Sequence, residues 1–138
     1  MAIHYLLDTN VLSQPIRPKP NAKVMSLLQR HRAEVVVPVI AWHELWFGCL
    51  RLPASRRRTD IEDYLNNVVA LMPMLSYDAS AAQWHAGERA RLATLGKTPS
   101  FADGQIAAIA RVNDLTLITA NGADYPYFDG LRVVDWSR

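Results

Sequence analysis

The sequence has a single cysteine, Cys49, among its 138 residues, and this scarcity excludes two classes of small protein. No intrachain disulfide can form, and a cysteine-rich zinc cage cannot be built from one thiolate. Such a composition is typical of a reducing compartment. We expect Cys49 to occupy the core and not to act as a nucleophile, because free cysteine usually behaves as a small hydrophobic residue.

Long apolar runs and a strong excess of one charge are also missing. No run approaches the roughly 18 apolar residues that a membrane helix needs. The start MAIHYLLDTN lacks the basic segment and the apolar core of a signal peptide. We therefore expect a soluble, cytoplasmic protein. The 15 basic and 13 acidic residues give a net charge of +2, which permits nucleic-acid binding but does not argue for it.

Several well-known catalytic motifs are absent as well. The sequence contains no G-x-S-x-G nucleophile elbow, no G-x-x-x-x-G-K-[ST] phosphate loop and no G-x-G-x-x-G dinucleotide fingerprint. His43 and Glu44 begin like the zinc-protease motif H-E-x-x-H, but Phe47 stands where the second histidine is required. We therefore discard the zinc-protease interpretation.

What the sequence does contain is an alternation of short apolar runs and amphipathic segments. Half of its residues are hydrophobic, enough for the core of one domain covering residues 1–138. The alternation predicts an α/β fold with a central parallel sheet between two helical layers. We expect strands at residues 3–7, 34–37, 74–77, 115–119 and 131–134. We expect a short helical turn at 9–14 closed by Pro15, a helix capped by Asn21, and helices at 39–52, 55–71, 79–95 (between Asp78 and Gly96) and 100–113.

Oxygen-bearing side chains follow the ends of the predicted strands. The run HYLLDTN stops its apolar stretch at Asp8, and Thr119, Asn121 and Asp124 follow the fourth strand. Asp103 lies in the first turn of the helix that leads into that strand. Because ligands of an open parallel sheet collect outside the carboxyl ends of its strands, these residues are candidates for one site.

Each of these residues also has a purely structural interpretation. Asp8 could accept backbone N–H bonds at a helix start. Ser100 and Asp103 fit the S-x-x-D spacing of a capping box. Asn121 and Asp124 fit a turn. Taken one residue at a time, these alternatives remain open.

Glu44 weakens the structural interpretations once the acids are considered together. It lies in the apolar run WHELWF, where a carboxylate is costly to bury unless a cation or a donor compensates it. Several carboxylates in one pocket repel each other, and a divalent cation removes that repulsion. Ligands that are all oxygen favour Mg²⁺ or Mn²⁺ over zinc. The acids together therefore predict a divalent-metal site.

An ordered set of motifs resembles the PIN-domain family and, within it, the VapC-type toxins of toxin–antitoxin pairs. The motifs are LLDTNVLS, HELWFG, SFADGQIAAIA, LTLITANGADY and GLRVVDW. The resemblance implies a PIN-like α/β/α domain that acts as an Mg²⁺-dependent endoribonuclease, with Mn²⁺ able to substitute. It further implies that metal-activated water cleaves RNA in the cytoplasm, that a cognate antitoxin restrains the toxin, and that the protein forms a homodimer.

The same resemblance assigns roles to individual residues. Asp8, Glu44 and Asp103 correspond to the three main acids of the family. Thr9 or Thr119 would orient a carboxylate or a metal-bound water.

The fourth acid of the family often follows the fourth strand closely, and here the match is looser. Asn121 comes first and Asp124 three residues later. We expect Asp124 to be the fourth acid and Asn121 to be a neutral helper. Asp124 reaches the pocket only if residues 121–124 form a helical turn or the loop folds back.

Two surface features have two interpretations each. A basic cluster after the Glu44 helix could be a solvated helix start or an RNA-binding rim that offsets the acids; it consists of Arg51, Arg56, Arg57 and Arg58. Three aromatic residues could belong to the core or to a dimer or antitoxin surface; they are Trp42, Trp46 and Tyr64.

Two rival functions remain. A phosphohydrolase of the haloacid-dehalogenase type also begins with an aspartate after its first strand, but it requires D-x-D, and Asn10 holds the second position here. A PIN domain that only binds a partner needs none of the acids, and the complete set argues against it. Metal-dependent cleavage of single-stranded RNA separates these alternatives.

Overall fold

The computed structural model describes residues 2–138. Its five strands form one sheet in the order β3–β2–β1–β4–β5, and every neighbouring pair is parallel. β1 lies in the centre, with Tyr5 beside Val35 of β2 and beside Thr116 of β4. The strands are β1 (Tyr5–Leu7), β2 (Val35–Pro38), β3 (Met74–Leu75), β4 (Thr116–Thr119) and β5 (Val133–Asp135). The predicted parallel sheet is confirmed.

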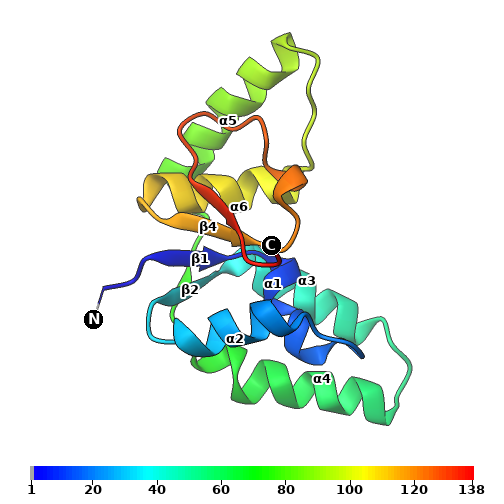
Figure 1. Ribbon diagram of the computed structural model, residues 1–138. Coiled ribbons are helices and arrows are strands. Elements are labelled where there is room, and N and C mark those ends of the chain that lie inside the picture. The colour runs from blue at the N-terminus through cyan, green and yellow to red at the C-terminus, as the bar shows by residue number, and fades with distance from the viewer. Residues whose placement is uncertain (1) are drawn as a thin grey trace.

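Helices connect the strands and form the outer layers, as Figure 1 shows. The α-helices are α1 (Thr9–Leu12), α2 (Ala22–Arg30), α3 (Val39–Leu50), α4 (Arg56–Asn67), α5 (Ala79–Thr94) and α6 (Phe101–Val112). Three short 3₁₀ helices are η1 (Gln14–Ile16), η2 (Val69–Leu71) and η3 (Gly122–Asp124). No helix among residues 2–138 is both long enough and apolar enough to cross a membrane.

The two faces of the sheet carry separate hydrophobic clusters. Side chains alternate along each strand, so Leu7 and Ile118 pack with α1 to α4, whereas Leu6 and Leu117 pack with α5 and α6. Cys49 belongs to the first cluster and is buried, as expected. This arrangement confirms the predicted three-layer α/β/α fold.

Polar N-caps begin two helices at the positions that the sequence predicts. The Asn21 side chain accepts a hydrogen bond from the Val24 amide at 3.0 Å, and the Asp78 side chain accepts one from the Ala81 amide at 2.9 Å. Gly96 follows α5 with φ of +72°, a left-handed conformation that favours glycine. Such caps each contribute about 1 kcal/mol to helix stability.

Two predicted boundaries are wrong. Pro15 does not close a helical turn over residues 9–14; α1 ends at Leu12, and Pro15 lies inside the first turn of η1, where its missing N–H is not required. The helix predicted for residues 55–71 is interrupted at Val68, whose φ of −120° and ψ of −63° end α4 before η2 begins.

The chain order creates a switch point between β1 and β4. The chain moves from β1 outward through β2 and β3, and then returns to the other side of β1 with β4. The loops that leave β1 and β4 therefore diverge at the carboxyl edge of the sheet, which is where doubly wound folds bind their ligands. The Asp8 amide donates a hydrogen bond to the Ile118 carbonyl at 3.0 Å and fixes the start of this edge.

Candidate active site

The four predicted acids come from four separate elements and line one cavity of about 260 Å³. Asp8 directly follows β1, Glu44 lies in the middle of α3, Asp103 in the first turn of α6, and Asp124 at the end of η3. The full lining is Asp8, Thr9, Asn10, Ser13, Arg17, Glu44, Asp103, Asp124 and Tyr125. The winding of the sheet thus gathers residues that lie up to 116 positions apart.

Asp8 is both a helix cap and a member of the acid cavity, the two roles that the sequence left open for it. Its side chain caps α1 by accepting a hydrogen bond from the Val11 amide at 3.0 Å. Yet the residue is only 2% exposed, and burial raises its pKa from 3.8 to about 7. The carboxylates of Asp124 and Asp103 raise this pKa further, while the Thr119 hydroxyl and the Val11 amide act in the opposite direction. An ordinary cap has a lowered pKa, so capping alone does not describe Asp8.

Asp103 likewise divides its roles between backbone and side chain. Ser100 caps α6, because its hydroxyl accepts a hydrogen bond from the Asp103 amide at 3.1 Å. The Asp103 carboxylate lines the acid cavity. Burial raises its pKa, and the carboxylates of Asp124 and Glu44 add to the effect.

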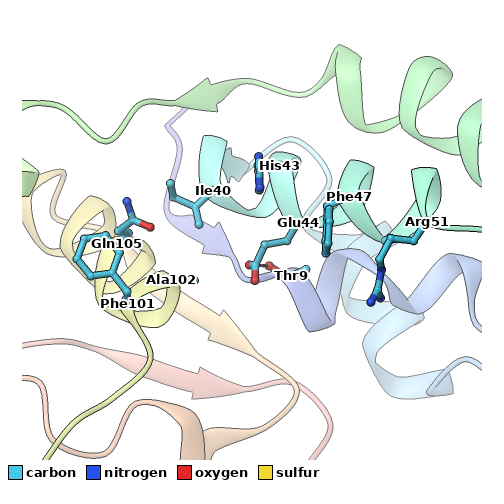
Figure 2. A pocket seen from close by; sticks show the side chains of 10 residues that line it. Thr9, Ile40, His43, Glu44, Phe47, Arg51, Phe101, Ala102 and Gln105 are labelled. Atoms are coloured by element: carbon cyan, nitrogen blue, oxygen red, sulfur yellow. Dashed lines mark hydrogen bonds between the residues drawn. The ribbon is translucent and has the colours of Figure 1, made fainter.

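Glu44 is held in place by Thr9. The Thr9 hydroxyl donates a hydrogen bond to Glu44 Oε1 at 2.6 Å. Figure 2 shows this carboxylate pointing from α3 toward Thr9. Thr9 therefore orients a carboxylate, which is one of the roles expected for it.

Asp124 reaches the cavity through the helical turn that its position requires. The Asp124 amide donates to the Asn121 carbonyl at 3.1 Å and closes η3. The Asn121 side-chain amide donates to Asp124 Oδ1 at 3.0 Å, and the Asn10 amide donates to Asp124 Oδ2 at 3.5 Å. Asn121 itself is exposed. This geometry favours Asp124 as the fourth acid and gives Asn121 a supporting role.

Thr119 acts on the loop that carries Asp124. It is fully buried at the end of β4, and its hydroxyl accepts hydrogen bonds from the Asn121 amide at 2.9 Å and from Asn10 Nδ2 at 3.4 Å. Asn10 Oδ1 in turn accepts from the Ala120 amide at 2.8 Å. The Asn10 side chain thus links α1 to the loop after β4.

Four lining residues were missed from the sequence, namely Asn10, Ser13, Arg17 and Tyr125. Tyr125 is 4% exposed, and burial raises its pKa far above the usual value, with further increases from the carboxylates of all four acids. Arg17 lines the cavity with its guanidinium donating to Ser13 Oγ at 3.1 and 3.2 Å. The signal for Tyr125 was its position directly after Asp124, whereas Arg17 lies in a proline-rich loop with no such signal.

The four arginines of the basic cluster lie at two separate places in the folded chain. Arg51 lines a larger cavity of about 780 Å³ beside Glu44, and its guanidinium lies 4.9 Å from the centre of the Phe47 ring. Arg56, Arg57 and Arg58 form the first turn of α4 instead. There the Arg58 guanidinium donates to the Leu52 carbonyl at 3.1 Å, and Arg57 donates to the Ile16 carbonyl. The structure places only Arg51, of these four, in the wall of a cavity that Glu44 shares.

The three aromatic residues of α3 and α4 are partly buried against the first hydrophobic cluster. Trp42 and Trp46 pack edge to face with ring centres 5.8 Å apart, and both contact the cluster. The Tyr64 hydroxyl donates to the Leu12 carbonyl at 2.6 Å. These contacts favour the core interpretation.

Comparison with known proteins identifies the family. The model of the PIN domain matches residues 5–130. The chain belongs to the PIN-domain family. Toxin FitB of Neisseria gonorrhoeae is 32% identical to this PIN domain, and the alignment covers 87% of this chain and 89% of that protein. The tRNA(fMet)-specific endonuclease VapC of Shigella flexneri is 30% identical, and the alignment covers 98% of this chain and 99% of that protein.

Solved structures share the fold of this PIN domain along its length. FitAcB from Neisseria gonorrhoeae superposes with a TM-score of 0.87 at 30% identity and covers 96% of this chain and 97% of that one. DNA-bound VapBC from Salmonella typhimurium superposes with a TM-score of 0.85 at 25% identity, and the match covers 97% of this chain and 98% of that one. The expected family resemblance is confirmed, and the haloacid-dehalogenase alternative is not supported.

The acid cavity of the PIN domain has the donor chemistry that a hard divalent cation requires. The acids offer only oxygen atoms, and the buried Asp8 lies among other carboxylates without an ion pair of its own. No three His, Cys, Asp or Glu side chains of residues 2–138 are placed to hold an ion by themselves.

Proposed function

We propose that this PIN-domain protein is an Mg²⁺-dependent endoribonuclease that acts as the toxin of a toxin–antitoxin pair in the cytoplasm, with Mn²⁺ able to substitute. The observation that carries the proposal is the convergence of Asp8, Glu44, Asp103 and Asp124 on one cavity at the switch point of the sheet. The names of the two relatives, a toxin and a tRNA endonuclease, support the same activity.

The four acids would bind the divalent ion partly through waters that it keeps, because no three of their side chains lie close enough together to ligate it directly. When bound, the ion supplies Lewis-acid polarisation of the phosphodiester and lowers the pKa of water. The chain's own residues set the geometry: Thr9 orients Glu44, while Asn10 and Asn121 hold Asp124. Positive charge bound here would also offset the mutual repulsion that raises the pKa of Asp8 and Asp103.

A protein partner belongs to the proposal. The solved relatives are the assemblies FitAcB and VapBC, which supports a cognate antitoxin for this chain. A homodimer is expected for the free toxin. The alternative of a PIN domain that only binds a partner fits poorly with four acids around one cavity.

The decisive experiment is RNA cleavage by the purified protein with Mg²⁺ and with EDTA. We expect cleavage with the metal, none with the chelator, and none in Asp8→Asn. Asparagine retains the oxygen that accepts from the Val11 amide, so the variant keeps its fold. The matched control is Asp60→Asn, an exposed aspartate on α4 that should cleave like wild type. Wild-type cleavage by a folded Asp8→Asn protein would contradict the assigned site.

A further inference from the structure

Exposed aromatic side chains border the acid cavity on both sides. Phe47 is 57% exposed, Phe101 51% and Tyr127 46%, which is unusual for large rings on a folded protein. Phe47 and Phe101 line the larger cavity of about 780 Å³, and Tyr127 lines another of about 420 Å³. The exposed large aliphatic side chains of residues 2–138, such as Leu71 and Val134, line neither of these cavities. The feature that gathers here is therefore the aromatic ring.

Each of these rings carries a basic side chain against it. The pairs are Arg51 with Phe47 at 4.9 Å, Arg89 with Phe101 at 5.1 Å and Lys97 with Tyr127 at 4.0 Å, measured to the ring centre. A flat ring beside a cation offers a stacking surface for a base and a contact for a phosphate in one place.

The three cavities are neighbours that share lining residues, and we refer to them together as the groove. The larger aromatic cavity shares Thr9 and Glu44 with the acid cavity, and the Tyr127 cavity shares Asp103 and Asp124 with it. Figure 2 shows the first junction, where Phe47 of α3 lies beside Glu44, while Phe101 of α6 lies farther away, beyond Ala102. The acids therefore lie between two arms, which we call the Phe47 arm and the Tyr127 arm.

We infer that this groove binds single-stranded RNA, with unpaired bases stacked on Phe47 and Tyr127 on either side of the scissile phosphate and Arg51 and Lys97 contacting the neighbouring phosphates. The inference rests on the proposed ribonuclease function and names the residues that hold its substrate. A cluster of carboxylates repels a polyanion, so cations on both sides of it are needed to retain the strand. A duplex offers no free base faces to the rings, which makes the groove selective for unpaired RNA.

Binding to a fluorescent, unstructured oligoribonucleotide of about 12 nucleotides tests the stacking role. Fluorescence anisotropy in EDTA reports binding without cleavage. Phe47→Ala and Tyr127→Ala should each weaken binding by about 5- to 150-fold, the usual loss for one stacked base. The control Leu71→Ala removes a side chain that is 80% exposed on η2 and should bind RNA like wild type. Duplex RNA should compete poorly with the labelled strand.

Salt dependence tests the phosphate contacts separately from stacking. Each lost phosphate contact lowers the slope of log affinity against log salt by about 0.7 for a single strand. Arg51→Ala and Lys97→Ala should each show this decrease, and Arg51→Lys should keep the wild-type slope. Arg132→Ala removes an exposed charge just before β5, at the opposite edge of the sheet, and should leave the slope unchanged.

The outcomes separate this inference from the proposed function. If wild-type protein neither binds nor cleaves RNA, the ribonuclease function itself fails and the inference with it. If wild type cleaves RNA with Mg²⁺ while folded Phe47→Ala and Tyr127→Ala bind RNA with wild-type affinity, the inference is overturned and the function stands. The aromatic arms would then be a surface for a protein partner. Melting temperatures of all variants confirm that the fold is retained.

Discussion

Two buried carboxylates in this protein have opposite surroundings. Glu88 on α5 is 8% exposed and accepts two hydrogen bonds from the Arg91 guanidinium, at 2.8 and 2.9 Å, and one from the Asp129 amide at 2.7 Å. Asp8 is 2% exposed and accepts a hydrogen bond from the Val11 amide, but its charged neighbours are other acids. The same chemical group is thus compensated at one place and left uncompensated at the other.

The two pKa values move in opposite directions as a result. The Arg91 hydrogen bonds hold the pKa of Glu88 below its usual value, whereas burial raises that of Asp8 to about 7. A carboxylate that serves the fold is satisfied within the chain. The charged form of Asp8, by contrast, destabilises the fold. Such a carboxylate is typical of a functional site, where a bound cation or substrate group supplies the positive charge.

The largest expected effect is on cleavage, in Asp103→Asn. Loss of one carboxylate from the cavity should lower the cleavage rate by about 10²–10³, the usual loss when one electrostatic contact to a reacting centre is removed. Expression of wild type should arrest cell growth, and this variant should relieve the arrest. Single-turnover cleavage and growth curves measure the two effects.

Ser100→Ala is the control for the capping role of the same turn. It should cost about 1 kcal/mol of stability and leave cleavage intact, because Ser100 contributes the cap and not the carboxylate. A folded Asp103→Asn protein that still arrests growth would show that the Asp103 carboxylate is not needed for the toxic activity.

The second prediction concerns the pH dependence of stability without metal. The pKa of Asp8 is higher in the folded protein than its unfolded value of 3.8, so its ionisation destabilises the fold progressively from about pH 4 to pH 7. Asp8→Asn should therefore raise the melting temperature relative to wild type by roughly 5 °C or more at pH 8 in EDTA. The difference should fade toward pH 4. Equal melting temperatures at pH 8 would mean that Asp8 carries no electrostatic penalty.

The third prediction concerns Glu88, the carboxylate that Arg91 compensates, and the stability that this contact provides. Glu88→Gln weakens the Arg91 contacts and should lower the free energy of unfolding by about 1–3 kcal/mol, while cleavage per folded molecule stays unchanged. Urea denaturation measures the loss. Glu62→Gln is the matched control, since its contact with Arg58 is exposed at 3.6 Å and contributes about 0–1 kcal/mol. If Glu88→Gln and Glu62→Gln have the same free energy of unfolding, then Glu88 does not stabilise the fold as a buried compensated carboxylate, and its contrast with Asp8 is lost.

Local patterns in the sequence were sufficient to predict most of the fold and the acids. An apolar run that stops at Asp8 identifies both the strand and its functional edge, because strand order in α/β folds brings such ends together. Asp103 was found through its helix start and Glu44 through its apolar neighbours. Each of these signals depends on residues next to it in the chain.

Features that no clear local pattern marks in the sequence were not predictable in the same way. Arg17 lines the acid cavity because the turn of η1 brings its guanidinium to Ser13 Oγ. The basic cluster looked continuous in the sequence, but the turn at Ser55 separates Arg51 from the α4 residues. The break at Val68 has no proline or glycine to mark it, so the periodicity predicted one helix where the structure has two elements.

The smallest expected effect distinguishes Asp124 from Asn121, two oxygen-bearing residues that follow β4. Asp124 lines the cavity and its carboxylate adds to the repulsion that raises the pKa of Asp8, so it should contribute charge to metal binding. Asn121 is exposed and acts on the site through one hydrogen bond to Asp124. Asp124→Asn should therefore raise the Mg²⁺ concentration needed for half-maximal cleavage by about tenfold, within the range for residues that support a metal site.

Asn121→Ala should raise that concentration only a few-fold, because Asn10 still donates to the other oxygen of Asp124. The measurement is an Mg²⁺ titration of cleavage for both variants beside wild type. A double variant with Asn10→Ala sharpens the comparison, since Asp124 then loses both side-chain donors and should bind metal almost as weakly as Asp124→Asn. If Asn121→Ala is the more impaired variant and Asp124→Asn titrates like wild type, then Asp124 serves the η3 turn, and the uncompensated carboxylates of the site are Asp8, Glu44 and Asp103 alone.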